Sequence, residues 1–308
     1  MKIVFLGTPD FAVEPLKAIF NSKHEILAVV TQPDKPVGRK AVITPCAVKT
    51  CAKNLNLKTL SYEKIRVDGV NDLKELKPDV MVTCAYGQIL SREILNIPKY
   101  GVINIHASLL PKYRGASPIQ WSIINGDKKT GVTIMQTEEG VDSGDIIKSV
   151  ETDILDNETA GELFNRLSIL GAKTIVDVLN DIECGKATYK KQDDSLATKV
   201  GMIKKEDGRI NFCKNSVEIV NLIRGLNPWP IAFTTLDGKT LKIYRAKTCN
   251  LKGNSGEVLV ADVKNGLIIG CNDTSISVLE LQLEGGKKMP VKDFLLGRKI
   301  PLGYVLGV

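Results

Sequence analysis

The sequence predicts an α/β protein in which a doubly wound, mostly parallel sheet is followed by a smaller C-terminal β-barrel domain of the OB type. Three observations carry this prediction. The chain has 308 residues, more than a single core usually supports, so two domains are expected. Its first 180 residues alternate continuous apolar runs with segments of helical periodicity. Short strands separated by Asp-Gly, Lys-Gly and Asn-Gly pairs then follow, as in a small antiparallel barrel.

Short apolar runs predict the strands of the first domain, and apolar residues at i, i+3 and i+4 predict its helices. Strands are expected at 2–6, 26–30, 79–83, 101–105 and 131–136. Helices are expected at 11–20, 45–54, 70–76, 118–125 and 159–180, of which the last is the longest. Continuous apolar strands are typical of a sheet covered on both faces, which is why a parallel arrangement is predicted.

A change in composition predicts the end of the first domain. Residues 185–205 lose their apolar periodicity and become polar, which is typical of a linker. One helix is expected after it, at 216–225, and short strands at 233–236, 241–246, 256–261, 267–271 and 275–281. We therefore predict a first domain at 1–188, a linker at 189–206 and a C-terminal barrel domain at 207–308.

Several function classes are disfavoured by the residues that the chain lacks. The first predicted strand-to-helix turn, 7–12, has a single glycine instead of Gly-x-Gly-x-x-Gly, and no Gly-x-x-x-x-Gly-Lys-Ser/Thr loop occurs. The seven cysteines include no Cys-x-x-Cys pair, and the only histidines, His24 and His106, are 82 positions apart. We therefore expect no nucleotide cofactor, no metal site and no disulfide framework, but reduced thiols in a cytoplasmic protein.

The charge of the chain is uneven. The net charge is +7, and residues 207–308 hold 14 Lys and Arg against 9 Asp and Glu. Such an excess fits either a polyanionic partner or a solvated basic face. The apolar runs all fall well short of the roughly 18 residues that a membrane-spanning helix needs, so no membrane partner is expected.

Polar side chains with catalytic potential follow the strand predicted at 101–105. Asn104 and His106 are two positions apart, so in a strand they project on the same face. Asp142 follows the next predicted strand, in the loop Val141-Asp142-Ser143-Gly144-Asp145. An amide, an imidazole and a carboxylate are suited to holding an oxyanion and moving a proton. A hydrogen-bonded structural histidine and a simple turn aspartate are the alternatives.

The segment at 104–120, which reads NIHASLLPKYRGASPIQ, resembles the signature of folate-dependent formyltransferases. The resemblance continues at 131–136 and 142–145 and runs almost end to end, with matches at 7–12, 32–34, 85–87 and 226–230. It implies a Rossmann-like formyltransferase catalytic domain followed by a tRNA-binding domain. Within this family the chain is most similar to the members that formylate the α-amino group of methionyl initiator tRNA.

The resemblance also implies roles for the three polar residues. Asn104 would donate its amide to the oxyanion, and His106 would supply a second donor or steady the developing charge. Asp142 would orient His106 and help to take the proton from the attacking amine, with either residue as the acceptor. The formyl donor would be 10-formyltetrahydrofolate, a cosubstrate rather than a tightly bound cofactor. A monomer is expected.

Two segments would form the folate pocket according to the same resemblance. The first is the loop after His106, with backbone groups and apolar side chains against the folate. The second resembles the pterin-pocket segment of the family. For the aliphatic residues, plain core packing is the alternative. The residues concerned are Ser108, Leu109, Leu110 and Pro111 in the first segment and Tyr86, Gly87, Gln88 and Ile89 in the second.

The loop at 33–49 corresponds to the family loop that meets the acceptor end of the tRNA. Lys35, Arg39 and Lys40 are the predicted tRNA contacts, since lysine and arginine bind phosphates and arginine also reads base edges. The family commonly continues Gly-Arg-Gly-Lys-Lys-Leu here, whereas this chain lacks the glycine after Arg39 and one basic residue. Trp229 is either a stacking platform for a base or a structural anchor.

Two other functions remain as alternatives. A formyltransferase for a small amine, such as a nucleotide-linked aminosugar or glycinamide ribonucleotide, would share the Asn104, His106 and Asp142 set. A non-catalytic RNA-binding protein on the same scaffold would be expected to have lost one of them. The basic C-terminal domain and the Arg39 loop favour the tRNA substrate.

Overall fold

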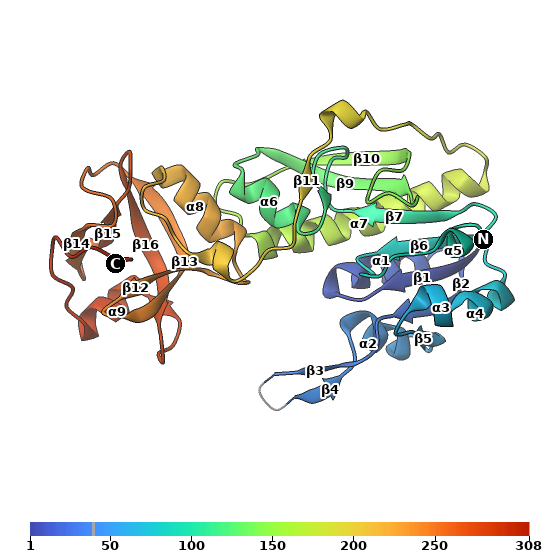
Figure 1. Cartoon of the computed structure of the whole chain (residues 1–308), viewed down its shortest axis with the longest axis horizontal. Coiled ribbons are helices and arrows are strands. Elements are labelled where there is room, and N and C mark those ends of the chain that lie inside the picture. Colours follow the sequence, from blue (N-terminus) through green and yellow to red (C-terminus); the bar gives the residue numbers. More distant parts are fainter. Residues whose placement is uncertain (39–40, 308) are drawn as a thin grey trace. The chain divides into compact units, whose positions relative to one another are not determined.

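The computed structural model describes residues 1–38 and 41–307, and these form two compact units (Figure 1). Unit 1 consists of Met1–Gly115, Lys129–Asp153 and Phe164–Val200. Unit 2 consists of Ala116–Lys128, Ile154–Leu163 and Gly201–Val308, of which Val308 is not described. Unit 2 thus includes two segments, 116–128 and 154–163, that fall within the first domain predicted at 1–188. The boundaries predicted from sequence stay a prediction.

Unit 1 is built on a sheet of seven strands in the order β10-β9-β7-β6-β1-β2-β5. Five neighbouring strands, from β7 to β5, are parallel, whereas β9 runs antiparallel to β7 and β10 antiparallel to β9. The prediction of a mostly parallel sheet is confirmed. The strands are β1 (Lys2–Gly7), β2 (Glu25–Thr31), β5 (Thr59–Ser61), β6 (Val80–Cys84), β7 (Val102–His106), β9 (Lys129–Gln136) and β10 (Ile146–Asp153).

The helices of unit 1 lie on both faces of this sheet. Residues of α3 (Ile65–Asp68), α4 (Val70–Leu76) and α5 (Arg92–Leu95) share a core cluster with Val4 and Val102. On the opposite face, α7 (Ala160–Glu183) approaches β7 closely, since a Cβ at its Gly171 would lie 3.0 Å from Ile105. The remaining helices are α1 (Val13–Phe20), preceded by the 3-10 turn η1 (Asp10–Ala12), and α2 (Ala47–Asn54).

Strand β10 is absent from the sequence prediction because its residues do not form an apolar run. It reads Ile-Ile-Lys-Ser-Val-Glu-Thr-Asp, and most of its residues are polar or charged. As the edge strand of the sheet it exposes alternate side chains, whereas β6 is buried at every position. A prediction based on apolar runs therefore misses an edge strand more easily than a strand that is buried on both faces.

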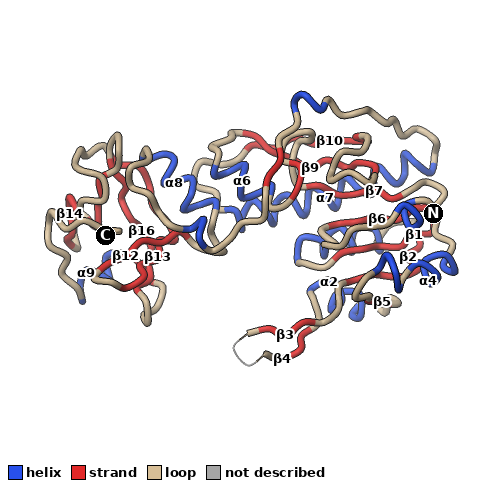
Figure 2. Tube along the Cα trace, viewed as in Figure 1, coloured by secondary structure: helices blue, strands red, loops and turns tan. Residues whose placement is uncertain are grey.

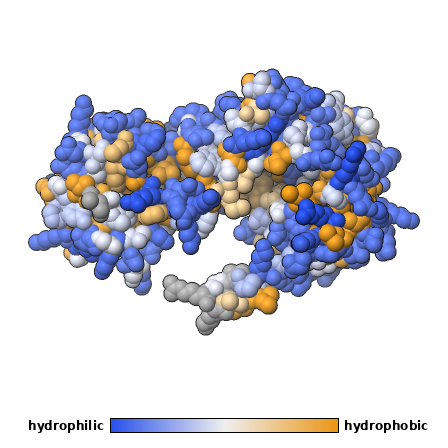
Figure 3. All heavy atoms as spheres, in the orientation of Figure 1, coloured by the Kyte–Doolittle hydropathy of each residue, from blue (hydrophilic) through white to orange (hydrophobic). Residues whose placement is uncertain are grey.

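A short hairpin replaces the predicted loop at 33–49. Its strands β3 (Lys35–Val37) and β4 (Val42–Thr44) are antiparallel, and Gly38 has a φ of 72° at the turn. The hairpin extends away from the sheet of unit 1 (Figure 1). Val42 and Ile43 are 59% and 70% exposed, and Figure 3 shows apolar atoms on the surface of this hairpin.

Unit 2 is built on an antiparallel sheet, as predicted, in the order β12-β13-β16-β15-β14, with β17 paired to β16. Figure 2 shows its long strands in red. The strands are β12 (Ala232–Leu236), β13 (Lys239–Cys249), β14 (Val258–Asp262), β15 (Gly266–Gly270), β16 (Ser275–Leu283) and β17 (Met289–Pro290). Its helices are α6 (Pro118–Ile124), α8 (Ser216–Gly225) and α9 (Val291–Gly297), with the 3-10 turn η3 (Glu206–Gly208).

The last residues of the described chain close this sheet. The Val258 N–H donates to the Tyr304 carbonyl at 2.8 Å, so the terminal segment is bonded to β14. The Gly307 N–H donates to the Thr235 carbonyl at 3.2 Å, so it is also bonded to β12. Since β12 and β14 are the two edges of the sheet, the segment bridges them and protects both from further pairing.

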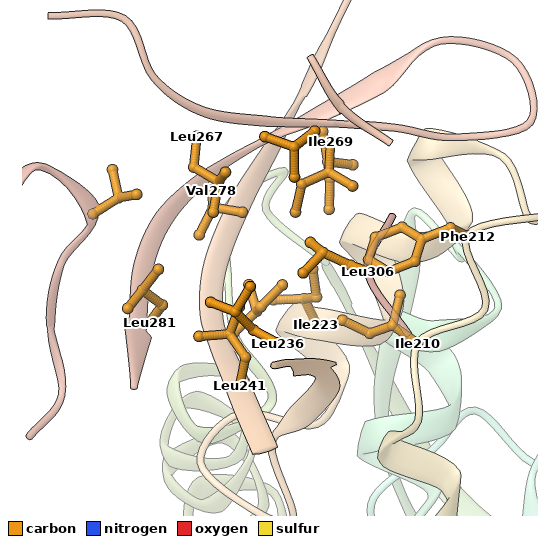
Figure 4. Close-up of a cluster of buried hydrophobic side chains, with 14 of the residues drawn as sticks. Ile210, Phe212, Ile223, Leu236, Leu241, Leu267, Ile269, Val278, Leu281 and Leu306 are labelled. Carbon is orange, nitrogen blue, oxygen red and sulfur yellow. The ribbon is translucent and has the colours of Figure 1, made fainter. Parts of the chain in front are cut away.

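An apolar cluster forms a core of unit 2. Side chains from the sheet, from α8 and from the closing segment converge in Figure 4. The residues labelled there are Ile210, Phe212, Ile223, Leu236, Leu241, Leu267, Ile269, Val278, Leu281 and Leu306. Arg224 on α8 ties the segment Ile154–Leu163 to this unit, because its Nη1 donates to the Leu155 carbonyl at 3.0 Å.

Candidate active site

The carboxyl end of β7 brings the three predicted catalytic residues together. Asn104 and His106 lie on the sheet face of Val102, and Asp142 comes from the loop between β9 and β10. The Asn104 Nδ2 lies 3.5 Å from Asp142 Oδ1. The His106 Nδ1 lies 3.6 Å from Asp142 Oδ2. One carboxylate thus faces both the amide and the imidazole.

Thr83, at the end of the neighbouring strand β6, fixes the orientation of the Asn104 amide. Its hydroxyl donates to Asn104 Oδ1 at 2.9 Å. The amide nitrogen therefore points toward Asp142 and the mouth of the site. If the amide were flipped, its oxygen would face a carboxylate oxygen, so electrostatic repulsion favours the orientation described. A preoriented N–H donor is what an oxyanion site requires.

His106 is buried, and its ring has two different neighbours. Nε2 lies 2.9 Å from the backbone carbonyl of Tyr113. A carbonyl can only accept, so Nε2 carries the proton of the neutral ring and Nδ1 is left unprotonated. Nδ1 faces the Asp142 carboxylate, which would stabilise a proton arriving there. The geometry therefore makes Nδ1 a proton-accepting position.

Asp142 is held in an unusual backbone conformation. Its φ is 50°, in the left-handed region that non-glycine residues rarely adopt. The Gly115 N–H donates to its Oδ2 at 2.8 Å. The same carboxylate oxygen therefore accepts from Gly115 and faces His106. A backbone conformation of this kind persists only where surrounding contacts hold it, and such residues concentrate at active sites.

The loop that follows His106 is fastened to β9. Thr133, which pairs with His106 across the two strands, donates from its hydroxyl to the Ser108 carbonyl at 2.7 Å. The Leu110 N–H donates to the same hydroxyl at 3.2 Å. Ser108 and Leu110 are buried, whereas Leu109 and Pro111 are partly exposed. Part of the predicted folate loop thus packs internally, and part of it faces outward at the strand end.

The second predicted folate segment leaves the end of β6, the strand next to β7. The carbonyls of Tyr86 and Gly87 both accept from the Gln32 amide at 3.1 Å. The Gln88 side chain bonds the Ile65 N–H and the Tyr62 carbonyl, each at 2.9 Å, so its polar atoms are engaged within the unit. Ile89 is 74% exposed.

Tyr86 is 4% exposed, and its hydroxyl has no hydrogen-bond partner within residues 1–38 and 41–307.

Of the three predicted tRNA contacts, Lys35 lies on β3 of the hairpin. The Lys35 ammonium donates to Gln32 Oε1 at 3.1 Å, and the residue is exposed. Arg39 and Lys40 lie outside the described residues. Trp229, in unit 2, is 53% exposed.

Sequence reasoning missed several residues that support the site. Thr83 was detectable in principle, because parallel pairing of the strands predicted at 79–83 and 101–105 places their ends together. The Tyr113 carbonyl and the Gly115 N–H are backbone groups, for which side-chain patterns give no signal. Gln192 donates to the carbonyls of Asp142 and Gly144 from a segment that the sequence predicted as linker.

In the described part of the chain, no group of three His, Cys, Asp or Glu side chains is arranged to hold a metal ion. Among the same residues, none of the helices combines the length and the apolar character that crossing a membrane requires.

Comparison with known proteins assigns the fold and the site to a class. A family model described as formyl transferase matches residues 1–179, and one described as the formyl transferase C-terminal domain matches residues 202–299. The chain therefore belongs to the formyl transferase family, and it is an enzyme of one-carbon formyl transfer.

Two full-length relatives of higher identity show which members of the formyl transferase family the chain is similar to. The chain is 44% identical over 308 residues to a methionyl-tRNA formyltransferase of Geobacter metallireducens, covering 100% of this chain and 99% of the relative. It is 46% identical to a methionyl-tRNA formyltransferase of Lachnospira eligens over 317 aligned positions, covering 100% of both.

A solved structure shows the same fold. An N-formyltransferase from Helicobacter canadensis, in complex with folinic acid and dTDP-3-aminofucose, matches with a TM-score of 0.70 at 22% identity. The match covers 94% of this chain and 100% of that chain. At this identity the similarity shows the fold alone.

Proposed function

We propose that this chain transfers the formyl group of 10-formyltetrahydrofolate to the α-amino group of methionyl initiator tRNA. Full-length relatives named methionyl-tRNA formyltransferases support this substrate. The observation that carries the chemistry is the meeting of Asn104, His106 and Asp142 at the end of β7. These are the groups needed to hold an oxyanion and to accept a proton.

In the first step the neutral amine nitrogen attacks the formyl carbon. A carbon–nitrogen bond forms, and the formyl oxygen becomes the oxyanion of a tetrahedral intermediate. Asn104 donates its Nδ2–H to this oxygen, because Thr83 holds the amide with its nitrogen toward the site. Losing one such donor typically costs roughly 100- to 1000-fold in rate.

In the second step the amine proton leaves and the donor is released. His106 Nδ1 accepts the proton, and the Asp142 carboxylate 3.6 Å away stabilises the resulting imidazolium. The bond between the formyl carbon and N10 of the folate breaks, and the departing N10 takes up the proton from the His106 imidazolium, which returns the ring to its neutral form. The oxyanion collapses to the carbonyl of the formylated product, so atoms and charges balance.

The formyl donor would occupy the ends of β6 and β7. Formyl transferases use folate derivatives, and the Helicobacter canadensis neighbour was crystallised with folinic acid. The loop formed by Ser108, Leu109, Leu110 and Pro111 and the segment from Tyr86 to Ile89 would bind it as a cosubstrate.

The tRNA would be bound through phosphate contacts. Lys35, Arg39 and Lys40 would meet the acceptor end, and the basic C-terminal residues would contact the backbone with little sequence preference. We further propose a monomeric cytoplasmic enzyme without a metal cofactor.

The experiment that tests this function measures formyl transfer from 10-formyltetrahydrofolate to a panel of acceptors. The panel contains methionyl initiator tRNA, methionyl elongator tRNA and small amines, including a nucleotide-linked aminosugar and glycinamide ribonucleotide. Fast transfer selective for the initiator tRNA is expected. Transfer only to a small amine would overturn the tRNA substrate, and no transfer to any acceptor would overturn the function.

A further inference from the structure

The segment that the sequence predicted as a linker is fastened to the catalytic unit. Lys190 exchanges two backbone hydrogen bonds with Ile146, each at 2.8 Å. Further along, β11 (Lys199–Val200) pairs with β8 (Arg114–Gly115). Figure 2 shows the stretch between these two ties mainly as loop, with the 3-10 turn η2 (Asp194–Leu196). Gln192 lies between these two backbone pairings, one on each side of it in the sequence.

Gln192 makes four hydrogen bonds and is only 6% exposed. Its Nε2 donates to the carbonyl of Asp142 at 2.9 Å and to the carbonyl of Gly144 at 2.8 Å. Its Oε1 accepts from Nε of Arg114 at 3.1 Å and from Nη2 at 2.9 Å. Because guanidinium nitrogens only donate, the amide orientation is determined: the oxygen faces Arg114 and the nitrogen faces the loop of Asp142.

Arg114 is equally buried, and it is held from a second direction. Its Nη2 also donates to Asp194 Oδ1 at 2.8 Å, and that carboxylate lies mostly in solvent. The residue after Arg114 is Gly115, whose N–H binds the Asp142 carboxylate at 2.8 Å. Arg114 and Gly115 therefore both contribute to holding Asp142. Gly115 binds the Asp142 carboxylate, and Gln192, which Arg114 orients, binds the Asp142 backbone carbonyl.

From these contacts we propose that Gln192 is a positioning residue for catalysis, which holds the left-handed backbone of Asp142 so that its carboxylate faces His106 and Asn104. This inference rests on the proposed function. A small displacement of Asp142 would lengthen both of its contacts, which are already 3.5 and 3.6 Å. Misplacing a catalytic group by about 1 Å can cost roughly 100-fold in rate.

The test uses the full chain with the substitution Gln192→Glu. The glutamate keeps an acceptor for Arg114 and removes the two donors to the Asp142 loop. We expect kcat for formylation of methionyl initiator tRNA to fall by about 10- to 100-fold. The KM values for tRNA and folate are expected to change less than about threefold, since Gln192 does not contact the proposed substrate residues.

A matched control is Gln282→Glu in unit 2. Gln282 also donates to a backbone carbonyl, that of Gly286 at 2.9 Å, and accepts from the Tyr244 hydroxyl. The same chemical change there should leave kcat within about twofold of the wild-type value. A second variant, Gln192→Met, removes the donors without adding charge and should reproduce the loss in kcat. It keeps the test decisive if the glutamate variant does not fold.

A double variant separates positioning from general structure. If Gln192 acts through Asp142, adding Gln192→Met to Asp142→Ala should slow the reaction little beyond Asp142→Ala alone. Independent, multiplying losses would overturn the inference, as would wild-type kcat in a folded Gln192→Met variant. These outcomes require an active wild-type enzyme, so they are distinguishable from failure of the proposed function, in which the wild type itself transfers no formyl group.

Discussion

The carboxyl end of β7 and the hairpin formed by β3 and β4 both carry predicted functional residues, but they hold them in opposite ways. At the end of β7, Asn104 is hydrogen-bonded to Thr83, and His106 is hydrogen-bonded to the Tyr113 carbonyl. Thr83 and Tyr113 are both buried. On the hairpin, Lys35 and the apolar Val42 and Ile43 are exposed. Chemistry depends on fixed geometry, whereas phosphate contact depends on charge and access.

The largest effect is expected at the rigid region, from Asn104→Ala. Removing the amide donor should lower kcat by roughly 100- to 1000-fold, while KM for tRNA changes little. Steady-state kinetics with methionyl initiator tRNA measures both. A loss confined to KM would mean that Asn104 contributes to binding, and the contrast with the hairpin would fail.

Thr83→Val should have the next largest effect. The variant removes the hydroxyl that orients the Asn104 amide at 2.9 Å and preserves the shape of the side chain. We expect kcat to fall about tenfold, less than for Asn104→Ala, because the donor is still present but no longer fixed. Thr83→Ser, which keeps the hydroxyl, is the control and should restore most of the rate.

The hairpin should respond in KM instead. Replacing Lys35, Arg39 and Lys40 together by alanine should raise KM for methionyl initiator tRNA and leave kcat nearly unchanged. Each lost phosphate contact should also reduce the slope of log KM against log salt by about one. Kinetics at several salt concentrations measures this slope. An unchanged slope would remove the hairpin from phosphate recognition.

The smallest effect on the formylation rate at neutral pH is expected from a substitution of Glu162, in unit 2. Hydrogen bonds from Thr159 and the nearby Arg245 guanidinium hold its pKa at about 2, well below its ordinary value of 4.5. The unfolded chain therefore binds this proton first as the pH falls. The stabilisation is complete above about pH 4.5 and is lost as the pH falls toward 2.

The variant Glu162→Gln should accordingly lose less stability than the wild type between pH 6 and pH 3, as measured by thermal denaturation. Its formylation rate at neutral pH should equal that of the wild type. A steeper acid loss in the variant would contradict the assignment of this carboxylate.

Much of the fold was predictable because burial leaves a pattern in the sequence. Strands β1, β6 and β7 are continuous apolar runs, and all three were predicted to within one residue at each end. Strand β10 was missed because most residues of this edge strand are polar or charged. The hairpin was missed because its two strands have three residues each and pair only with one another.

The site was predictable only where its geometry follows from local spacing. Asn104 and His106 are two positions apart on one strand, so their common face follows from the strand period. The contact between Gln192 and the Asp142 loop joins residues 50 positions apart through a backbone carbonyl, and no side-chain pattern signals it. Polar composition made residues 189–206 resemble a linker, whereas Gln192 within them is buried.

The most direct test of the account is a single-turnover measurement of formyl transfer to methionyl initiator tRNA at saturating concentrations of both substrates. The wild type would be compared with Asn104→Ala and with the triple hairpin variant. We predict that the hairpin variant reaches nearly the wild-type rate at saturation, while Asn104→Ala remains at least about 100-fold slower. Wild-type turnover by Asn104→Ala would contradict the proposed role of the end of β7.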